Sequence, residues 1–303
     1  MTQIKTKRRK PSVSVIGPGR LGQALALALR SLGYPILAFV ARDPADARKA
    51  VNAVIRSGTP ARALGWDQLV ELPITNLILI TTPDDAIADV ARRLASLKIG
   101  KVKLPTVLHT SGALASDVLS PLSESGFHTG SLHPLVSISE PGAGARALRG
   151  AFYCFEGDKT ALRVARLIVT DLKGKSFSVG AENKALYHAA AVMASGHLTA
   201  LFDLATEMLA VCGLKPSFAR EVLMPLVESA VSNLKTSAPE NALTGTFARG
   251  DVATVRRHLA ALSRKELGEA LEVYKLLGRH SVELAKKNGL DAQVLEQIRS
   301  LLE

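Results

Sequence analysis

A chain of 303 residues is long enough for two domains, each with its own hydrophobic core. The composition is that of a globular protein, with 47% hydrophobic residues, and the two cysteines, Cys154 and Cys212, lack the spacing of a disulfide framework or zinc site. The net charge is +11, but five positive charges lie in the first ten residues and no basic–aromatic pattern accompanies the others.

We therefore expect no metal, no nucleic-acid partner and a reducing, cytoplasmic setting. No apolar run reaches the roughly 18 to 20 residues that span a bilayer. The longest candidate, residues 189–202, is interrupted by Ser195, His197 and Thr199. The basic residues 1–10 lead into a strand pattern rather than an apolar signal segment, so we expect a solvated tail and no membrane partner.

The first part of the chain alternates short apolar runs with helical patterns, which is typical of a parallel sheet built from βαβ units. The pattern predicts strands at residues 12–17, 34–42, 76–83, 103–112, 127–138, 151–157 and 175–180. It predicts helices at residues 20–33, 43–58 and 84–97, and a helix or turn at 113–126. The predicted fold is α/β, with an N-terminal Rossmann domain whose doubly wound sheet is mostly parallel.

The pattern changes near Gly180. Long helical patterns follow at residues 182–212, 216–232, 251–262, 265–288 and 291–302, with no strand pattern among them. We therefore expect a dinucleotide-binding domain at residues 11–180 and an all-helical substrate and dimerisation domain at residues 181–303.

The segment GPGRLG links the first predicted strand to the first predicted helix. Gly17, Gly19 and Gly22 have the G-x-G-x-x-G spacing, which suits a sharp turn, a close approach to a pyrophosphate, and tight packing of helix on strand. The N-terminus of the helix also favours phosphates. Because the context is strand–loop–helix, we predict that this loop binds a dinucleotide, with the intervening residues Pro18, Arg20 and Leu21 at the cofactor.

The end of the second predicted strand bears on which dinucleotide binds. An NAD site usually places an acidic residue there, about 20 residues after the loop, for the ribose hydroxyl. Here Arg42 follows Ala41, and an arginine can pair with the 2′-phosphate of NADP. Asp43 is then interpreted as a helix cap; if the strand ends one residue later, Asp43 becomes the ribose ligand. We favour NADP over NAD.

Further candidate residues lie at the ends of the later strands. Thr81, Thr82 and Pro83 follow a buried strand, where open α/β sheets bind ligands. Ser111 and Gly112 follow the next strand, either as contacts to nicotinamide or substrate or as a turn and helix cap. His133, before Pro134, is a candidate site residue or a structural histidine. These residues would line one edge of the sheet.

The first helix after the sheet carries polar residues at helical spacing. Lys184, Tyr187 and His188 are three and four residues apart, so they are neighbours on one helix face, which continues to Ser195. Lys184 could hold a substrate carboxylate or donate a proton to a carbonyl, or it could be a solvated lysine.

These segments together resemble a known group of oxidoreductases. The glycine loop, ARDP, HTSGAL, SLHPL, NKALYHAAAVMASGHLTAL and ALTGTFARGD resemble Rossmann-like enzymes with a C-terminal helical domain of unknown function. Such enzymes are similar to pyrroline-5-carboxylate reductases, prephenate dehydrogenases, deazaflavin-dependent NADP reductases and β-hydroxyacid dehydrogenases. The resemblance covers residue 13 to about residue 288.

The resemblance implies roles for particular residues. In β-hydroxyacid dehydrogenases the corresponding lysine is the catalytic acid/base, so Lys184 would take that role, with Tyr187 and His188 at positions that are commonly asparagine. A histidine there could move the proton-transfer role to His188. By the same resemblance Thr244, Gly245 and Arg249 would contact substrate, from the same or a partner subunit, and the helical domain would form a homodimer.

We therefore expect an NADP-dependent oxidoreductase that transfers a hydride between nicotinamide and a C=O or C=N carbon of a small, anionic substrate. Lys184 or His188 would supply the proton, and Ser111 and His133 would orient the substrate. The fold also permits a non-catalytic NADP-binding sensor or interaction protein.

Overall fold

The computed structural model describes residues 9–55, 60–97 and 104–303. The expected N-terminal tail therefore lies mostly outside the described residues, as do the end of the second predicted helix and the first residue of the strand predicted at 103–112. The chain forms two compact units, Met1–Ser195 and Gly196–Glu303.

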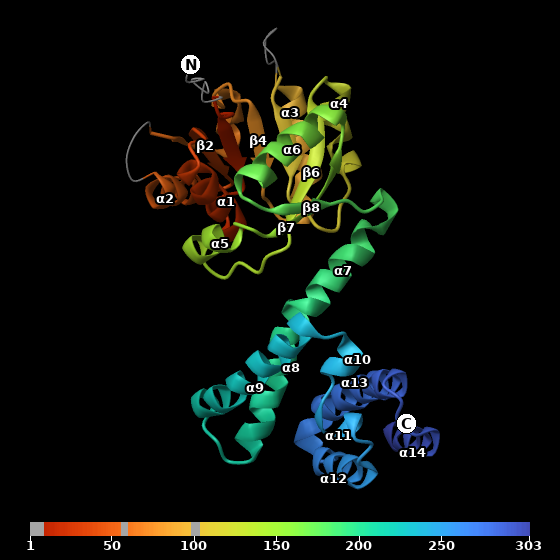
Figure 1. Ribbon diagram of the computed structural model, residues 1–303. Helices are drawn as coiled ribbons and strands as arrows, with labels where there is room; N and C mark the ends of the chain where they lie inside the picture. Colours follow the sequence, from red (N-terminus) through yellow and green to blue (C-terminus); the bar gives the residue numbers. More distant parts are fainter. Residues whose placement is uncertain (1–8, 56–59, 98–103) are drawn as a thin grey trace, which may run out of the picture. The chain divides into compact units, whose positions relative to one another are not determined.

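The first unit contains an eight-stranded sheet with the strand order β3-β2-β1-β4-β5-β6-β7-β8 (Figure 1). The first six strands follow the Rossmann order, β7 pairs antiparallel with β6, and β8 runs parallel to β7. The strands are β1 Val13–Ile16, β2 Ile36–Ala41, β3 Arg62–Gly65, β4 Leu77–Ile80, β5 Thr106–His109, β6 His128–Pro134, β7 Phe152–Gly157 and β8 Lys175–Phe177. The predicted mostly parallel Rossmann sheet is confirmed.

Helices cover both faces of this sheet because its central strands are apolar on both faces. Leu77 and Leu79 of β4 pack into one core, whereas Ile78 and Ile80 pack into the other. The first face carries α1 Arg20–Ser31, α2 Pro44–Val54, α5 Pro141–Ala147 and α6 Lys159–Asp171. The second carries α3 Asp84–Ser96, α4 Ser120–Glu124 and the short 3-10 turns η1 Trp66–Glu71 and η2 Ser116–Leu119.

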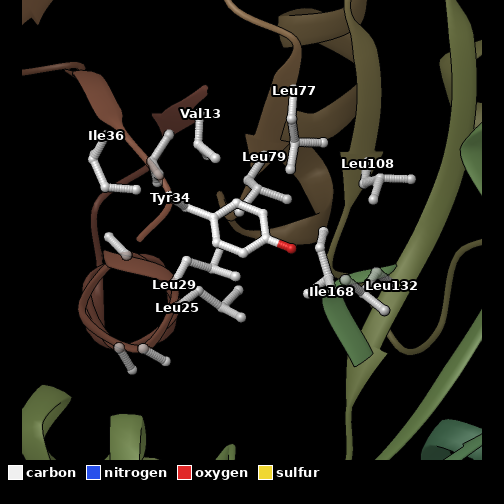
Figure 2. Packing of buried hydrophobic residues seen from close by; sticks show 14 of the residues in the cluster. Val13, Leu25, Leu29, Tyr34, Ile36, Leu77, Leu79, Leu108, Leu132 and Ile168 are labelled. Carbon is white, nitrogen blue, oxygen red and sulfur yellow. The ribbon is translucent and has the colours of Figure 1, made fainter. Parts of the chain in front are cut away.

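Tyr34 lies within the first of these cores. Figure 2 shows its ring among aliphatic side chains of α1, the central strands and α6. Its hydroxyl leaves this apolar environment to hydrogen-bond the carboxylate of Asp171, which also pairs with Lys10. The polar end of a buried tyrosine thus finds a partner at the end of α6.

The first unit ends with η3 Ala181–Asn183 and α7 Lys184–Ala194. A continuous helix was predicted over residues 182–212, but the chain turns at Ser195 before α8 begins at Gly196. The N–H of Ser195 bonds the carbonyl of Val192, and its hydroxyl bonds the carbonyl of Ala191 at 2.8 Å. The division between the compact units falls at this turn.

The second unit is all-helical, as predicted. Its elements are α8 Gly196–Val211, α9 Pro216–Thr236, α10 Pro239–Ala242, α11 Gly245–Ala248, α12 Val252–Leu262, η4 Lys265–Leu267, α13 Gly268–Lys287 and α14 Ala292–Leu302. A small core joins α12, α13 and α14 through residues such as Val255, Val282 and Ile298.

The segment Ala181–Val211 has a high mean hydropathy. By length and composition alone it meets the criterion for a membrane-spanning helix, with a mean hydropathy of 1.2 over its best window. The serine, histidine and threonine in the run at 189–202 were interpreted as breaks in an apolar segment. They lower the mean hydropathy only slightly, so the segment still meets the criterion. Core helices of soluble proteins, which are mostly buried, meet the same criterion, whereas 6% of this window is buried.

Candidate active site

A pocket of about 410 Å³ lies at the carboxyl ends of the central strands of the first unit. Open α/β sheets bind ligands at this edge, where the strand order reverses beside β1. The pocket is lined from four strand ends and from α7, by Arg20, Leu21, Thr81, Thr82, Asp84, Thr110, Ser111, Gly112, His133, Pro134, Val136, Ile138 and His188. It therefore joins the glycine loop to both candidate histidines.

The glycine loop has the geometry that a dinucleotide requires. Gly17 has φ +87°, and a Cβ there would lie 2.7 Å from the backbone nitrogen of Thr82. A Cβ at Gly22 would lie against the hydroxyl of Thr81, which itself donates to the carbonyl of Gly17 at 2.6 Å. These two glycines allow the loop, α1 and β4 to approach one another closely.

Gly19 differs from the other two, because a Cβ there would meet nothing within 4 Å. It precedes α1 and provides no side-chain cap, so the first N–H groups of α1 are left for another acceptor. An N-terminus of this kind is suited to phosphate oxygens. The loop therefore fits the pyrophosphate of a dinucleotide.

Thr82 and Asp84 extend the pocket beyond the loop. The hydroxyl of Thr82 is buried and has no hydrogen-bond partner among the described residues, so it could bond a ligand. Pro83 precedes α3, and Asp84 in the first turn accepts a hydrogen bond from the Ser111 hydroxyl at 2.8 Å. Asp84 was not among the residues predicted from the sequence, although an acid directly after the β4 strand pattern could have indicated it.

The end of β2 bears on the two alternatives for the cofactor ribose. β2 ends at Ala41, and the carboxylate of Asp43 accepts a hydrogen bond from the N–H of Ala45 at 2.7 Å. Asp43 is therefore the N-cap of α2. Arg42 is exposed directly beyond the strand, as the NADP interpretation expects.

Ser111 has a structural role as well as its place in the pocket. Its hydroxyl accepts hydrogen bonds from the N–H groups of Ala113 and Leu114, which fixes the turn after β5. The buried His109 supports the same turn, because its Nδ1 accepts from the N–H of Ser111 and its Nε2 donates to the carbonyl of Ala115. Burial lowers the pKa of His109 to about 4, and the nearby Lys184 ammonium adds to this effect.

The pairing of β6 with β7 creates a polar layer beside the pocket. Antiparallel register places Ser131 opposite Glu156 and His133 opposite Cys154. Glu156 accepts hydrogen bonds from the Ser131 hydroxyl at 2.7 Å and from both the N–H and the hydroxyl of Ser116. Its carboxylate is thus held in place by three donors.

The predicted face of α7 packs on this layer. Lys184 is fully buried, and its ammonium donates to the Ser131 hydroxyl at 3.3 Å, next to Glu156. Burial lowers the pKa of Lys184, and the nearby Cys154 and Glu156 oppose that shift. Lys184 does not line the 410 Å³ pocket. Its catalytic role stays a prediction, and the structure places other groups nearer the pocket.

The two histidines lie at the pocket itself. His133 and His188 are edge-to-face, with ring centroids 5.5 Å apart, and the Tyr187 hydroxyl lies 2.7 Å from His133 Nδ1. A Cβ at Gly112 would lie against His188 Nδ1 and 2.9 Å from His133 Nε2, so only glycine fits there. Burial lowers the pKa of His133 to about 4, aided by the neighbouring His188 and Lys184.

The remaining predicted residues lie elsewhere. Ser195 lines a second hollow of about 290 Å³, which shares His133 and His188 with the first. Thr244, Gly245 and Arg249 belong to the helical unit, where Thr244 precedes α11 and Arg249 follows it. Their contact with substrate stays a prediction. Within the part of the chain that the structure describes, no group of three metal-ligating side chains occurs.

Comparisons with known proteins agree with this architecture. Residues 1–134 match the Rossmann-like domain family, and residues 151–281 match a family described as a domain of unknown function, DUF2520. The chain therefore combines a Rossmann-like domain with a C-terminal domain of unknown function, as the resemblance implied. No curated protein matches the chain significantly.

Solved structures share the fold. A Bacteroides fragilis protein provisionally assigned as an NADP oxidoreductase is 21% identical, with a TM-score of 0.72 over 92% of this chain and 99% of that one. A 1-pyrroline-5-carboxylate reductase of Streptococcus pyogenes is 12% identical, with a TM-score of 0.58 over 96% and 99%. A reductive aminase of Aspergillus terreus, in complex with NADPH and ethyl-5-oxohexanoate, is 17% identical, with a TM-score of 0.54 over 97% and 92%.

Proposed function

We propose that the protein is an NADP-dependent oxidoreductase that transfers a hydride between nicotinamide and a C=O or C=N carbon of a small substrate. One observation carries this proposal: a single pocket joins the glycine loop at the start of α1 to two histidines at the end of β6 and on α7. Phosphate-binding backbone and groups able to donate hydrogen bonds thus share one cavity.

The cofactor assignment rests on the chain's own residues and on its structural relatives. The open space at Gly19, the unpartnered Thr82 hydroxyl and the exposed Arg42 fit the pyrophosphate, the ligand's polar groups and the 2′-phosphate respectively. The Aspergillus terreus reductive aminase is solved with NADPH. When bound, nicotinamide would supply the hydride chemistry, and the chain's residues would bind, orient and donate protons.

The pocket favours histidine over Lys184 as the proton-donating group. His133 and His188 line the cavity, whereas the Lys184 ammonium is buried beside Ser131 and Glu156. The proposal does not require an anionic substrate, because the lysine expected to hold a carboxylate is engaged elsewhere. Of Lys184 and His188, the two residues considered as the source of the proton, we therefore propose His188. His133 would then be oriented toward the oxygen or nitrogen atom of the substrate's C=O or C=N group.

The first test is cofactor binding followed by turnover. We expect NADPH to bind more tightly than NADH, and Arg42→Ala to weaken NADPH about 10-fold or more without changing NADH, because only NADPH carries the 2′-phosphate. Arg163→Ala removes an exposed arginine from α6 and serves as the matched control. Equal affinity for both cofactors would contradict the NADP assignment.

The second test is NADPH oxidation over a panel of small keto acids, uncharged ketones and cyclic imines. Turnover of any of them by the wild-type protein supports the oxidoreductase. Tight NADPH binding with no turnover across the panel would favour the alternative, a non-catalytic NADP-binding sensor or interaction protein.

We also propose that the protein is a homodimer formed through the helical unit. The resemblance implies this assembly, and the helices α8 and α9 expose large apolar side chains, including Leu198, Phe218, Val222 and Leu226. An exposed apolar surface of this extent is typical of a protein–protein contact.

A further inference from the structure

The direction of the hydrogen bond between His133 and Tyr187 follows from the chemistry of the groups around it. The Tyr187 hydroxyl lies 2.7 Å from His133 Nδ1, and the two rings are edge-to-face at 86°. A phenol can donate or accept, and a neutral imidazole carries its one proton on either nitrogen. Whether Nδ1 or Nε2 of His133 carries the proton therefore depends on whether the Tyr187 hydroxyl donates or accepts this hydrogen bond.

Three features make Tyr187 the donor. Burial raises the pKa of Tyr187, so the phenol keeps its proton, and the pKa of His133 is lowered to about 4, so its ring is neutral at pH 7. The other partner of the Tyr187 hydroxyl is the thiol of Cys154, whose pKa burial raises. Sulfur is a weak acceptor and an imidazole nitrogen a good one, so the phenol proton is directed to His133 Nδ1 rather than to the sulfur of Cys154.

The surroundings of His133 fit this direction. His188 and Lys184 on α7 and His109 at the end of β5 are the ionisable groups whose charges bear on its ring, and each disfavours an added proton. Cys154 lies opposite on β7. On the pocket side, His133 lines the cavity and its Nε2 lies beside Gly112, where a Cβ would approach it to 2.9 Å.

We propose that Tyr187 is a positioning residue that holds His133 as its Nε2–H tautomer, so that His133 donates a hydrogen bond from Nε2 to the C=O or C=N group of the substrate. This inference rests on the proposed oxidoreductase function. It assigns the residue that donates a hydrogen bond to the substrate's C=O or C=N group. The bond strengthens as negative charge develops on the substrate heteroatom during hydride addition. His133 stays neutral throughout.

The test reads the tautomer directly, by 15N chemical shifts of the imidazole nitrogens in the protein without cofactor. The sequence contains seven histidines, and the His133→Gln variant assigns the signals of His133. We expect wild-type His133 to be neutral, with a protonated Nε2 and an unprotonated Nδ1, from pH 6 to pH 8. If His133→Gln does not fold, sequential assignment of the wild-type protein identifies the same signals. A protonated Nδ1 in the wild-type protein would overturn the proposal.

Removal of the hydroxyl gives the second readout. In Tyr187→Phe we expect both His133 tautomers to be populated, and kcat to fall about 10- to 100-fold while the NADPH dissociation constant changes less than twofold. An unchanged tautomer and unchanged kcat would overturn the proposal. Because the tautomer is read without turnover, failure of the oxidoreductase assignment would show separately, as NADPH binding without oxidation.

The chain provides a matched control in its helical unit. The Tyr274 hydroxyl lies 2.8 Å from His258 Nδ1, with rings at 86°, which reproduces the His133–Tyr187 contact away from the pocket. Tyr274→Phe should change the signals of His258 and leave both the His133 tautomer and kcat within twofold of wild type. A loss of kcat in Tyr274→Phe equal to that in Tyr187→Phe would mean that the effect is not specific to the pocket.

Discussion

Lys184 is a fully buried ammonium group, and the Ser131 hydroxyl links it to the carboxylate of Glu156, which balances its charge. The Ser131 hydroxyl accepts from Lys184 and donates to Glu156, so a cation and an anion share one small polar layer. Isolated buried charges are strongly unfavourable, whereas paired and hydrogen-bonded ones are tolerated. Lys184 therefore stabilises Glu156 and acts on His133 through its charge.

We predict that Lys184→Met destabilises the first unit by about 1–3 kcal/mol, because it leaves the partly buried Glu156 carboxylate without its cation. The same change should raise the pKa of His133 from about 4 toward its ordinary value, since the Lys184 charge is one of the causes of the shift. Urea unfolding and an NMR titration of His133 measure the two effects. Lys159→Met, on the exposed first turn of α6, is the control.

The kinetics of Lys184→Met distinguish the two proton assignments. If His188 donates the proton, the variant should keep measurable turnover at neutral pH. Complete loss of turnover with unchanged folding and NADPH binding would return the catalytic role to Lys184, as the resemblance to β-hydroxyacid dehydrogenases implies.

Two buried histidines make the stability of the first unit depend on pH. The pKa values of His109 and His133 are lowered to about 4 in the folded protein, against 6.5 for an unperturbed histidine. Between these values the unfolded chain binds protons that the folded chain does not, so stability is complete above pH 7 and falls as the pH decreases. We expect a loss of roughly 1–2 kcal/mol per histidine by pH 5.

Urea unfolding at pH 7.5, 6 and 5 measures this loss, with the fluorescence of Trp66, the single tryptophan, reporting on the first unit. His128→Gln changes a half-exposed histidine beside Asp158 and should keep the full pH dependence. An unfolding free energy that is constant from pH 7.5 to pH 5 would contradict the burial of both rings in neutral form.

Among the elements, two glycines of the β1–α1 loop should differ in their effect on the unfolding free energy while both affect NADPH affinity. Gly22→Ala should destabilise the fold by about 1–3 kcal/mol, because its Cβ would lie against Thr81 and 2.7 Å from the Gly17 carbonyl oxygen. Gly19→Ala meets nothing within 4 Å and has an ordinary φ of −70°. Its unfolding free energy should change by less than about 0.5 kcal/mol.

Both variants should nevertheless lose NADPH affinity, Gly22→Ala by distorting the loop and Gly19→Ala by placing a methyl group where the pyrophosphate approaches. Thermal unfolding and a binding titration on the same samples measure the two quantities. If Gly19→Ala binds NADPH as the wild type does, the pyrophosphate does not lie over this loop.

The elements with strong local patterns could be predicted from the sequence, and those that depend on distant partners could not. The segment VSVIGPGRLG specifies strand, turn and helix by its own composition, and the structure confirms them. The edge strand β3, with only four residues, and the helix α6 were missed, as was the reversal of β7. Short edge strands carry little periodic signal, and strand direction is set by the whole connection.

The same limit applies to the site. Helical spacing correctly placed Lys184, Tyr187 and His188 on one face of α7. Which of them reaches the pocket depends on the register of β6 and β7, because Ser131 and Glu156 draw Lys184 into the interior. No local pattern contains that register, so the lysine looked more accessible in the sequence than it is in the fold.

At the scale of the whole molecule, apolar surface is the feature still to be explained. Phe218, Val222 and Leu226 recur every four residues on α9, and Leu226 is 68% exposed. The segment Ala181–Val211 also meets the composition criterion for a membrane span. A second copy of the chain and a lipid bilayer are the two environments that could cover these residues, and they give different behaviour in solution.

We predict that a second copy covers α9, so the purified chain sediments as a dimer without detergent and does not float with phosphatidylcholine vesicles. Leu226→Asp combined with Leu234→Asp should place two charges in that contact and shift the protein to monomer at micromolar concentration, because an unpaired carboxylate is costly to bury. Val70→Asp, at a 78% exposed valine of the first unit, should remain dimeric.

A wild-type monomer, or flotation with the vesicles, would contradict the dimer and make the bilayer the better account of the apolar helices. Since the proposed NADPH pocket is lined by residues of the first unit, the monomeric variant should still bind NADPH with wild-type affinity, which separates assembly from cofactor binding.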